Sequence, residues 1–120
     1  MKEFDAQVRI DGAMAVIDLQ GTIDSRAESA LDAAYGNCDQ GGAGTVALDF
    51  TKVDYINSTG IALLVSLLAK ARRDSRPVVA WGLTDHYREI FEITRLADFL
   101  EVVTDEQAAR AATGTTTGEG

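Results

Sequence analysis

One short segment in the middle of the chain constrains the fold more than any other. Thr45–Phe50 reads Thr-Val-Ala-Leu-Asp-Phe, which is nearly all apolar and rich in side chains that favour strands. A strand with one face in water alternates apolar and polar residues, whereas a strand covered on both faces shows a near-continuous apolar run. The segment therefore predicts a central strand with both of its faces covered.

The N-terminal part of the chain has the pattern of two paired strands. Phe4–Ile10 alternates apolar and polar residues, as a half-buried strand does. Asp11-Gly12 follows, a preferred dipeptide for a two-residue hairpin turn. We therefore expect Ala13–Gln20 to form the partner strand of an N-terminal hairpin.

Helix signals follow the hairpin and also occur near the C-terminus. Ser25–Glu28 fits a capping box, in which a serine and a glutamate satisfy each other's unpaired amides at the start of a helix. Ala27–Tyr35 then has the spacing of a buried helical stripe. A second capping box, Thr104–Gln107, is expected to open a short final helix at Ala108–Ala112. The first helix is expected to end in a loose connection that contains the glycines at 36, 41, 42 and 44.

The central part of the chain alternates strand and helix signals. A second helix is expected to start at Thr59 or Gly60, and a third is expected to be capped by Thr84 or Asp85. The predicted core stripe of the second helix consists of Ile61, Leu64, Val65 and Leu68, widened by Leu63 and Leu67. Two further strands are predicted, at Val78–Trp81 and at Phe99–Val103.

The order of these elements predicts the fold class. An N-terminal hairpin followed by strand-helix crossovers gives an α/β domain, with a mixed β-sheet that is mostly parallel at its centre and about four helices packed against it. A chain of 120 residues is long enough for one domain with one core and too short for two. We expect a single domain at 1–112 and a disordered C-terminal tail at 113–120.

The charge of the chain argues against direct binding of nucleic acid. The formal net charge is -8 and the pI is near 4.4, whereas nucleic-acid binding needs a positive surface. The basic cluster at Lys70–Arg73 with Arg76 is interpreted as the last turn of a helix, where cations favour the negative end of the dipole. An acidic protein can still be steered toward a partner with a basic surface.

The sequence offers little for catalysis or metal binding. His86 is the only histidine and Cys38 the only cysteine, so a zinc site and an internal disulfide are not expected. His86 is interpreted as a solvated or partly packed helix residue, and Ser58 is not in a Gly-x-Ser-x-Gly elbow. We therefore expect no catalytic residues, no metal, no cofactor and no enzymatic activity.

Two further features concern membranes and aromatic contacts. The longest apolar stretch, Ile61–Ala69, is interrupted by Ser66 and is too short to span a membrane, and the N-terminus lacks the apolar region of a secretion signal. We therefore expect a cytoplasmic protein with no membrane contact. Trp81 is interpreted either as core or rim packing or as an interface contact, and the sequence does not choose between these.

Small polar residues between the central strand and the second helix form the most unusual segment. In Tyr55–Gly60, Asn57 or Ser58 is suited to cap the helix, and Gly60 permits a close approach of backbones. On local physics alone, this capping function is sufficient to explain the segment.

Two motifs in the chain resemble those of STAS domains, the family of bacterial anti-sigma factor antagonists. Tyr55–Gly60 resembles the family signature of a hydrophobic pair, an acid or amide, Ser, Ser or Thr, and Gly. Gly21–Asp24 resembles an earlier Gly-x-x-Asp motif of the family. The order of elements agrees with the family over roughly Phe4 to Ala112.

The resemblance implies partner switching in the regulation of transcription. The unmodified antagonist would bind an anti-sigma factor that is also a serine kinase, and a sigma factor would be released. The kinase would then phosphorylate Ser58, the complex would dissociate, and a serine phosphatase would restore the antagonist. The partner-binding residues carried over from the family are Asp24, Ser25, Tyr55, Ile56, Asn57, Thr59 and Gly60.

Asn57 departs from the family pattern, because many members have Asp at this position. Asn keeps the size and the capping ability of Asp but lacks its charge. If that charge positions the hydroxyl for phosphoryl transfer, transfer to this chain is slow or absent. Thr59 is a second candidate acceptor, although its side chain is also suited to pack in the first helical turn.

Two alternative functions remain at this point. The first is a STAS scaffold or transporter-associated interaction module that binds a partner without a phosphoswitch. The second is a small-ligand binder or enzyme that uses the Ser58 turn, which the lack of a base and of metal ligands disfavours.

Overall fold

The apolar segment 45–50 forms the first half of the central strand of a five-stranded sheet. The computed structural model describes residues 3–38 and 44–119. The strands are β1 (Asp5–Asp11), β2 (Met14–Ile23), β3 (Thr45–Ile56), β4 (Val78–Trp81) and β5 (Glu101–Val102). The helices are α1 (Glu28–Asn37), α2 (Ser58–Arg73), α3 (Asp85–Ile93) and α4 (Glu106–Glu119), with short 3₁₀ helices η1 (Ser25–Ala27) and η3 (Leu96–Asp98).

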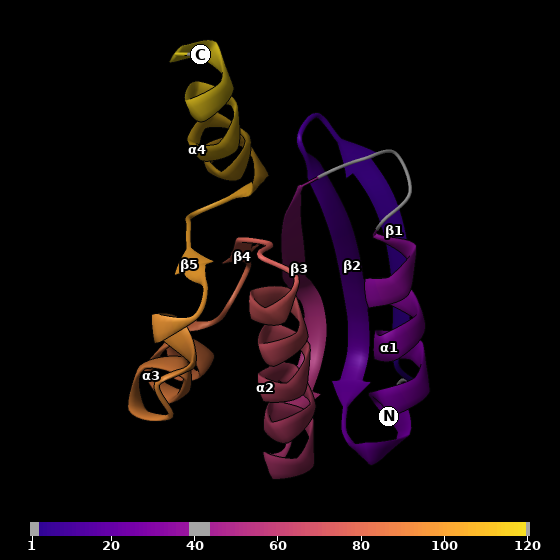
Figure 1. The fold of residues 1–120 in the computed structure, drawn as a ribbon. Coiled ribbons are helices and arrows are strands. Elements are labelled where there is room, and N and C mark those ends of the chain that lie inside the picture. The colour runs from indigo at the N-terminus through magenta and orange to yellow at the C-terminus, as the bar shows by residue number, and fades with distance from the viewer. Residues whose placement is uncertain (1–2, 39–43, 120) are drawn as a thin grey trace.

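The sheet has the mixed topology that the sequence predicts. Its strand order is β1-β2-β3-β4-β5. β1 pairs with β2 in an antiparallel hairpin, and every later pair is parallel. α1 and α2 lie side by side against the sheet, and α4 lies apart from them near the C-terminus (Figure 1). The predicted fold class is therefore confirmed.

The two faces of the sheet bury two separate apolar clusters. Successive residues of a strand point to opposite faces, so β2 contributes to both clusters. Ala15, Ile17 and Leu19 belong to the larger cluster, which includes buried residues of α1 and α2. Met14 and Val16 belong to the smaller cluster, together with Trp81 and with Ala109 of α4. The central strand is thus covered on both faces, and Trp81 is a core residue.

Ion pairs hold α4 to the N-terminal hairpin. Arg9 of β1 pairs with Asp18 of β2 and with Glu106 of α4, each at 2.6 Å. Arg110 pairs with Asp11 at 2.8 Å. These pairs join α4 to the hairpin, in addition to the packing of Ala109 in the second cluster.

Both predicted capping boxes are wrong in detail, because an aspartate acts as the cap in each place. Asp24 Oδ1 accepts the Arg26 amide at 2.9 Å and caps η1, and α1 has no side-chain cap. Asp105 Oδ1 accepts the Ala108 amide at 2.8 Å at the start of α4. Aspartate is among the best N-cap residues, and its short side chain reaches the second or third amide as well as serine or threonine does. The predicted cap of α3, Thr84, is confirmed.

β3 and α4 are longer than the sequence predicts. β3 continues through 51–56, which were expected to form a link, because this stretch pairs with the end of β2 after a shift in register. α4 spans Glu106–Glu119, whereas a short helix was expected at Ala108–Ala112, since each residue added to an existing helix gains a hydrogen bond. The expected loop glycines 41 and 42 and the last residue, Gly120, lie outside the described residues.

The buried face of α2 is rotated relative to the predicted stripe. Leu64 and Leu68 are buried as expected, together with Leu67 and Ala71. Val65 was expected in the core, but its exposed fraction is 48%. Val65 follows Leu64 by one residue, about 100° around the helix, which points it away from the sheet.

Candidate functional site

The two predicted motifs meet at one edge of the sheet. β2 and β3 are parallel and end together, since Ile23 pairs with Ile56. The Asn57 amide then donates to the Ile23 carbonyl at 3.2 Å. The turn after β2, which starts at Asp24, therefore lies beside the start of α2. Binding sites in parallel sheets commonly lie at this carboxyl edge.

Asn57, and not Ser58, caps α2. The Asn57 Oδ1 atom accepts the Gly60 amide at 2.8 Å. Ser58 is the first residue of the helix and is exposed, as is Thr59. Because the cap is provided by its neighbour, the Ser58 hydroxyl has no part in holding the helix start.

Gly60 allows the start of α2 to pack on the end of β2. A Cβ atom at this position would lie 2.0 Å from the Ile23 carbonyl oxygen and 2.8 Å from its carbon. The Gly60 φ angle is helical, so the absence of a side chain, and not backbone freedom, is what this position requires. Gly60 is buried and therefore fixes the distance between the two turns.

Asp24 carries a stable negative charge beside the α2 start. The Arg26 side chain pairs with its carboxylate at 2.8 Å, and the Arg26 amide donates to it as well. These hydrogen bonds hold the pKa of the Asp24 carboxyl below its ordinary value. At neutral pH, the turn after β2 therefore carries the ion pair of Asp24 with Arg26, and the start of α2 carries the uncharged side chains of Asn57, Ser58 and Thr59.

The predicted partner-binding residues divide into exposed and buried ones. Tyr55 has an exposed fraction of 55%, and Ser25 and Thr59 are also exposed. Ile56 and Gly60 are buried, so they position the turns and present no side chain to a partner. The exposed side chains among these residues are therefore small and polar, apart from the large aromatic side chain of Tyr55.

Tyr87 of α3 supports the site, and the sequence did not predict this role. The Ile56 amide donates to the Tyr87 Oη atom at 2.9 Å, immediately before the α2 cap. In the sequence, Tyr87 lies 31 residues after Ile56. No sequence pattern signals such a contact, because it depends on how α3 packs beside β3.

Removing the Tyr87 hydroxyl should loosen the start of α2. In Tyr87→Phe, the Ile56 amide loses its acceptor, and an unpaired backbone donor costs about 1–3 kcal/mol. We expect the free energy of unfolding in urea to fall by about that amount and hydrogen exchange of the Ile56 amide to accelerate.

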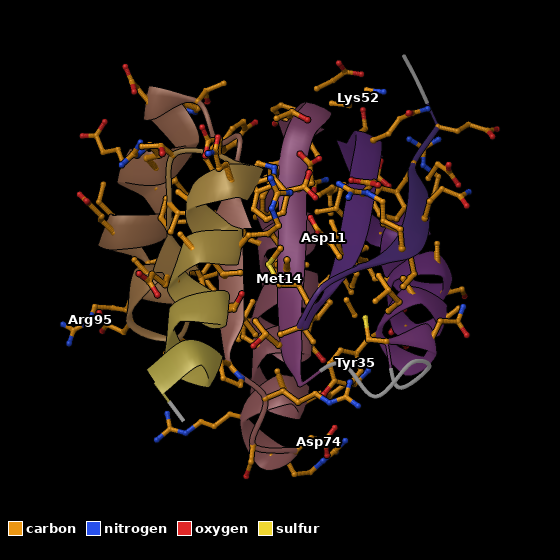
Figure 2. All side chains as sticks on the ribbon, turned by 90° about the horizontal axis from the view of Figure 1, so that it is seen from above. Asp11, Met14, Tyr35, Lys52, Asp74 and Arg95 are labelled. Carbon is orange, nitrogen blue, oxygen red and sulfur yellow. The ribbon has the colours of Figure 1, made fainter. Side chains whose placement is uncertain are left out.

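Tyr35→Phe is the matched control for this prediction. The Tyr35 hydroxyl donates to the Asp74 carboxylate at 2.7 Å (Figure 2), so its removal leaves an exposed carboxylate that water can solvate. In Tyr35→Phe, hydrogen exchange of the Ile56 amide should be as slow as in the unmodified chain. Equal Ile56 exchange in both variants would contradict a role of Tyr87 at the turn.

Other chemistry has little support in the described part of the chain. His86 is exposed on α3, with its ring 5.0 Å from that of Tyr87. Across residues 3–38 and 44–119, no three His, Cys, Asp or Glu side chains are grouped so that they could hold a metal ion. In the same residues, no helix is long and apolar enough to cross a membrane.

Comparison with known families and proteins identifies the domain. The family model described as "Mlab, STAS domain" matches residues 6–104. The BtrV protein of Bordetella bronchiseptica, whose name assigns it to the anti-sigma factor antagonists, is 32% identical over 104 residues. This match covers 87% of the chain and 89% of BtrV.

Solved structures share the fold at lower sequence identity. The anti-sigma factor antagonist SpoIIAA in its unphosphorylated form matches with a TM-score of 0.68 and 15% identity, over 94% of the chain and 98% of SpoIIAA. The phosphorylated form of SpoIIAA from Bacillus matches with a TM-score of 0.66 and 19% identity, over 92% and 99%. A sulfate transporter family protein from Wolinella succinogenes matches with a TM-score of 0.77 and 12% identity, over 92% of each chain. From the family match and the BtrV relationship, the chain belongs to the STAS domain family of anti-sigma factor antagonists.

Proposed function

We propose that the chain binds an anti-sigma factor with serine kinase activity, and that phosphorylation of Ser58 ends this binding. The observation that carries the proposal is the position of Ser58. Its side chain is exposed at the first residue of α2, directly after the Asn57 cap, and the start of this helix lies beside the turn after β2. The unmodified protein would hold the anti-sigma factor and release a sigma factor, and a serine phosphatase would reverse the modification.

The proposed contact surface consists of the two turns. Asp24, Ser25 and Tyr55 present exposed or partly exposed side chains, and Asn57, Ser58 and Thr59 lie beside them. Tyr55 is suited to serve as an anchor, since exposed tyrosines are frequent among the residues that dominate interface energies. Ile56 and Gly60 would act through the position of the backbone.

The proposed modification is a phosphoryl transfer from ATP. The Ser58 Oγ atom attacks the γ-phosphorus, the bond to the ADP oxygen breaks, and the hydroxyl proton passes to a base of the kinase. The acceptor is fixed at the start of a 16-residue helix, so little ordering is needed when the kinase binds. Hydrolysis of the phosphoserine by the phosphatase returns the hydroxyl and releases inorganic phosphate.

The charge of a phosphate explains how the switch would work. A phosphoserine carries about -1.5 to -2 charges near neutral pH. The helix has no acidic residue in its first turn, and its N-terminal amides favour an anion, so the fold tolerates the phosphate. In the complex, the same dianion would face a surface fitted to a neutral hydroxyl and would be buried there without a partner. SpoIIAA, whose fold is similar, exists in both an unphosphorylated and a phosphorylated form, which supports a modification of this kind.

Asn57 fits this scheme despite the aspartate that is common in the family. Its amide oxygen retains the helix cap. Its neutral side chain also leaves the phosphate with one fewer carboxylate beside it than an aspartate would. We expect the cap to keep Ser58 in position for transfer.

The proposal is tested by phosphorylation with the cognate kinase and ATP, followed by intact mass measurement. The unmodified chain should gain one phosphate, Ser58→Ala should gain none, and Thr59→Ala should still gain one. Thr59→Ala is the matched control, because it removes the neighbouring hydroxyl and leaves Ser58 in place.

Two results would contradict the proposal. A phosphate that persists in Ser58→Ala and disappears in Thr59→Ala would assign the acceptor to Thr59. If a kinase that is active on another substrate left the unmodified chain without phosphate, the function would be that of a STAS interaction module without a phosphoswitch.

A further inference from the structure

An apolar groove lies between α2 and η3, beside the edge of the core that contains Leu68 and Leu96. It has a volume of about 190 Å³, and its lining includes Val65, Leu68, Arg72, Leu96 and Phe99. We call it the α2–η3 groove. Val65 and Phe99 have exposed fractions of 48% and 49%, which are large values for apolar side chains. Large exposed apolar side chains that line a hollow often mark an interaction site.

The groove continues into a second hollow toward the end of α2. This hollow has a volume of about 380 Å³ and reaches Pro77. Leu68, Arg72 and Phe99 line both hollows, so the two are joined across these residues. Together they form an elongated depression rather than a single pocket, which suits a peptide segment better than a small molecule.

The charge of the groove is opposite to that of the chain. The Arg72 guanidinium lies 5.5 Å from the centre of the Phe99 ring. In the described part of the chain, Arg72 has no carboxylate within ion-pair distance, although the net charge of the protein is -8. Arg95 lies on the other side of the groove, pairs with Asp98 at 2.9 Å, and points outward (Figure 2). A partner group that complements this groove is therefore apolar with a carboxylate beside it.

The groove and Ser58 lie on one face of the same helix. Ser58, Val65 and Arg72 are spaced by seven residues, which is close to two full turns. All three are exposed, and the small residues Ala62 and Ala69 between them are exposed as well. Val65 is about 10 Å along the helix from Ser58. An interface of ordinary size, about 800 Å² on each partner, covers both positions.

We propose that the α2–η3 groove is a second docking site for the partner that contacts Ser58, and that it takes a segment with an apolar side chain flanked by carboxylates. This inference rests on the proposed function, because it assigns the groove to the anti-sigma factor kinase. The apolar side chain lies against Val65 and Phe99, and a carboxylate pairs with Arg72. The groove then supplies affinity at a distance from the phosphorylated hydroxyl.

The test uses two variants that place a charged residue in the groove and one control variant elsewhere on the surface. Val65→Lys places an ammonium group in the apolar groove, and Arg72→Glu reverses the complementary charge. Ile10→Lys is the matched control, because Ile10 has the same exposed fraction, 48%, and lies in β1 next to the hairpin turn. The probe is the purified anti-sigma factor kinase, and the Kd is measured by titration calorimetry.

The groove variants should bind the kinase more weakly, and their Ser58 hydroxyl should still accept phosphate. Val65→Lys and Arg72→Glu should each raise the Kd at least about tenfold, which corresponds to about 1.4 kcal/mol. Ile10→Lys should leave it unchanged. With ATP present, the two groove variants should raise the KM for the chain as a kinase substrate and leave the kcat unchanged, since Ser58 and its cap are intact.

The outcomes separate this inference from the proposed function. If the unmodified chain failed to bind the kinase, both would be overturned. If it bound, and both groove variants kept its Kd and KM, only the groove assignment would be overturned. A change from dimer to monomer in Val65→Lys, with kinase affinity unchanged, would assign the groove to a second copy of the chain instead.

Discussion

Gly60→Ala should destabilise the protein by about 3 kcal/mol or more. The added methyl group would lie 2.0 Å from the Ile23 carbonyl oxygen, which belongs to the backbone and cannot rotate away. Overpacking commonly costs about 1–3 kcal/mol. Displacement of the helix start would also break the bond from the Gly60 amide to the Asn57 cap, which contributes about 1 kcal/mol. Urea unfolding followed by circular dichroism measures the loss.

Gly36→Ala is the matched control for that variant. Gly36 lies in α1, where an added Cβ atom has no neighbour within 4 Å. Alanine is a better helix former than glycine, so this change should be neutral or should stabilise the chain by up to about 1 kcal/mol. Similar losses of stability in both variants would show that the contact between α2 and β2 is less tight than described.

Ser58→Asp should weaken binding of the anti-sigma factor kinase by roughly a hundredfold, about 3 kcal/mol. The substitution introduces a permanent negative charge at the first residue of α2, next to the turn that contains the Asp24 carboxylate. A desolvated like-charge contact in an interface costs several kcal/mol. The circular dichroism spectrum should be unchanged, because the helix start favours an anion and Asn57 still provides the cap.

Ser29→Asp serves as the charge-matched control. Ser29 is exposed in the first turn of α1, outside the proposed contact surface, so the same charge is added at a comparable helix position. Its Kd should be close to that of the unmodified chain. A comparable loss of kinase affinity in both variants would show that the added net charge, and not its position at the Ser58 turn, weakens binding. A loss of folded signal in Ser58→Asp would instead make Ser58 a structural residue.

The fold could be predicted because its strongest patterns are local. The hairpin signal at Asp11-Gly12, the apolar run at 45–50 and the repeated strand-helix alternation are each visible within a few residues. The turn itself lies one residue later than predicted, at Gly12 and Ala13, because Asp11 pairs with Met14 as the last residue of β1. The end of β3 was missed, because its pairing with β2 requires a register shift that no local pattern specifies. The exposure of Val65 was missed for a similar reason. Periodicity gives a buried stripe, but neighbouring elements decide which edge of it is covered.

The residues at the start of α2 could be predicted from the sequence, but the contact from α3 that supports them could not. Asn57, Ser58 and Gly60 could be placed at a helix start because capping residues and glycine have local signatures. The choice of Asn57 over Ser58 as the cap needed the backbone angles, since both side chains can accept the amide. Tyr87 could not be assigned at all, because its bond to Ile56 joins two elements distant in the sequence.

The burial of Trp81 under α4 gives the protein an intrinsic fluorescent probe. It is the only tryptophan, with an exposed fraction of 3%. The indole belongs to the cluster that contains Met14 and Ala109, on the sheet face opposite to the cluster of α1 and α2. Its emission therefore reports whether α4 is seated on the sheet. Arg9 and Arg110 form ion pairs between the hairpin and α4, so a salt titration of this emission would test whether these pairs help to keep α4 on the sheet.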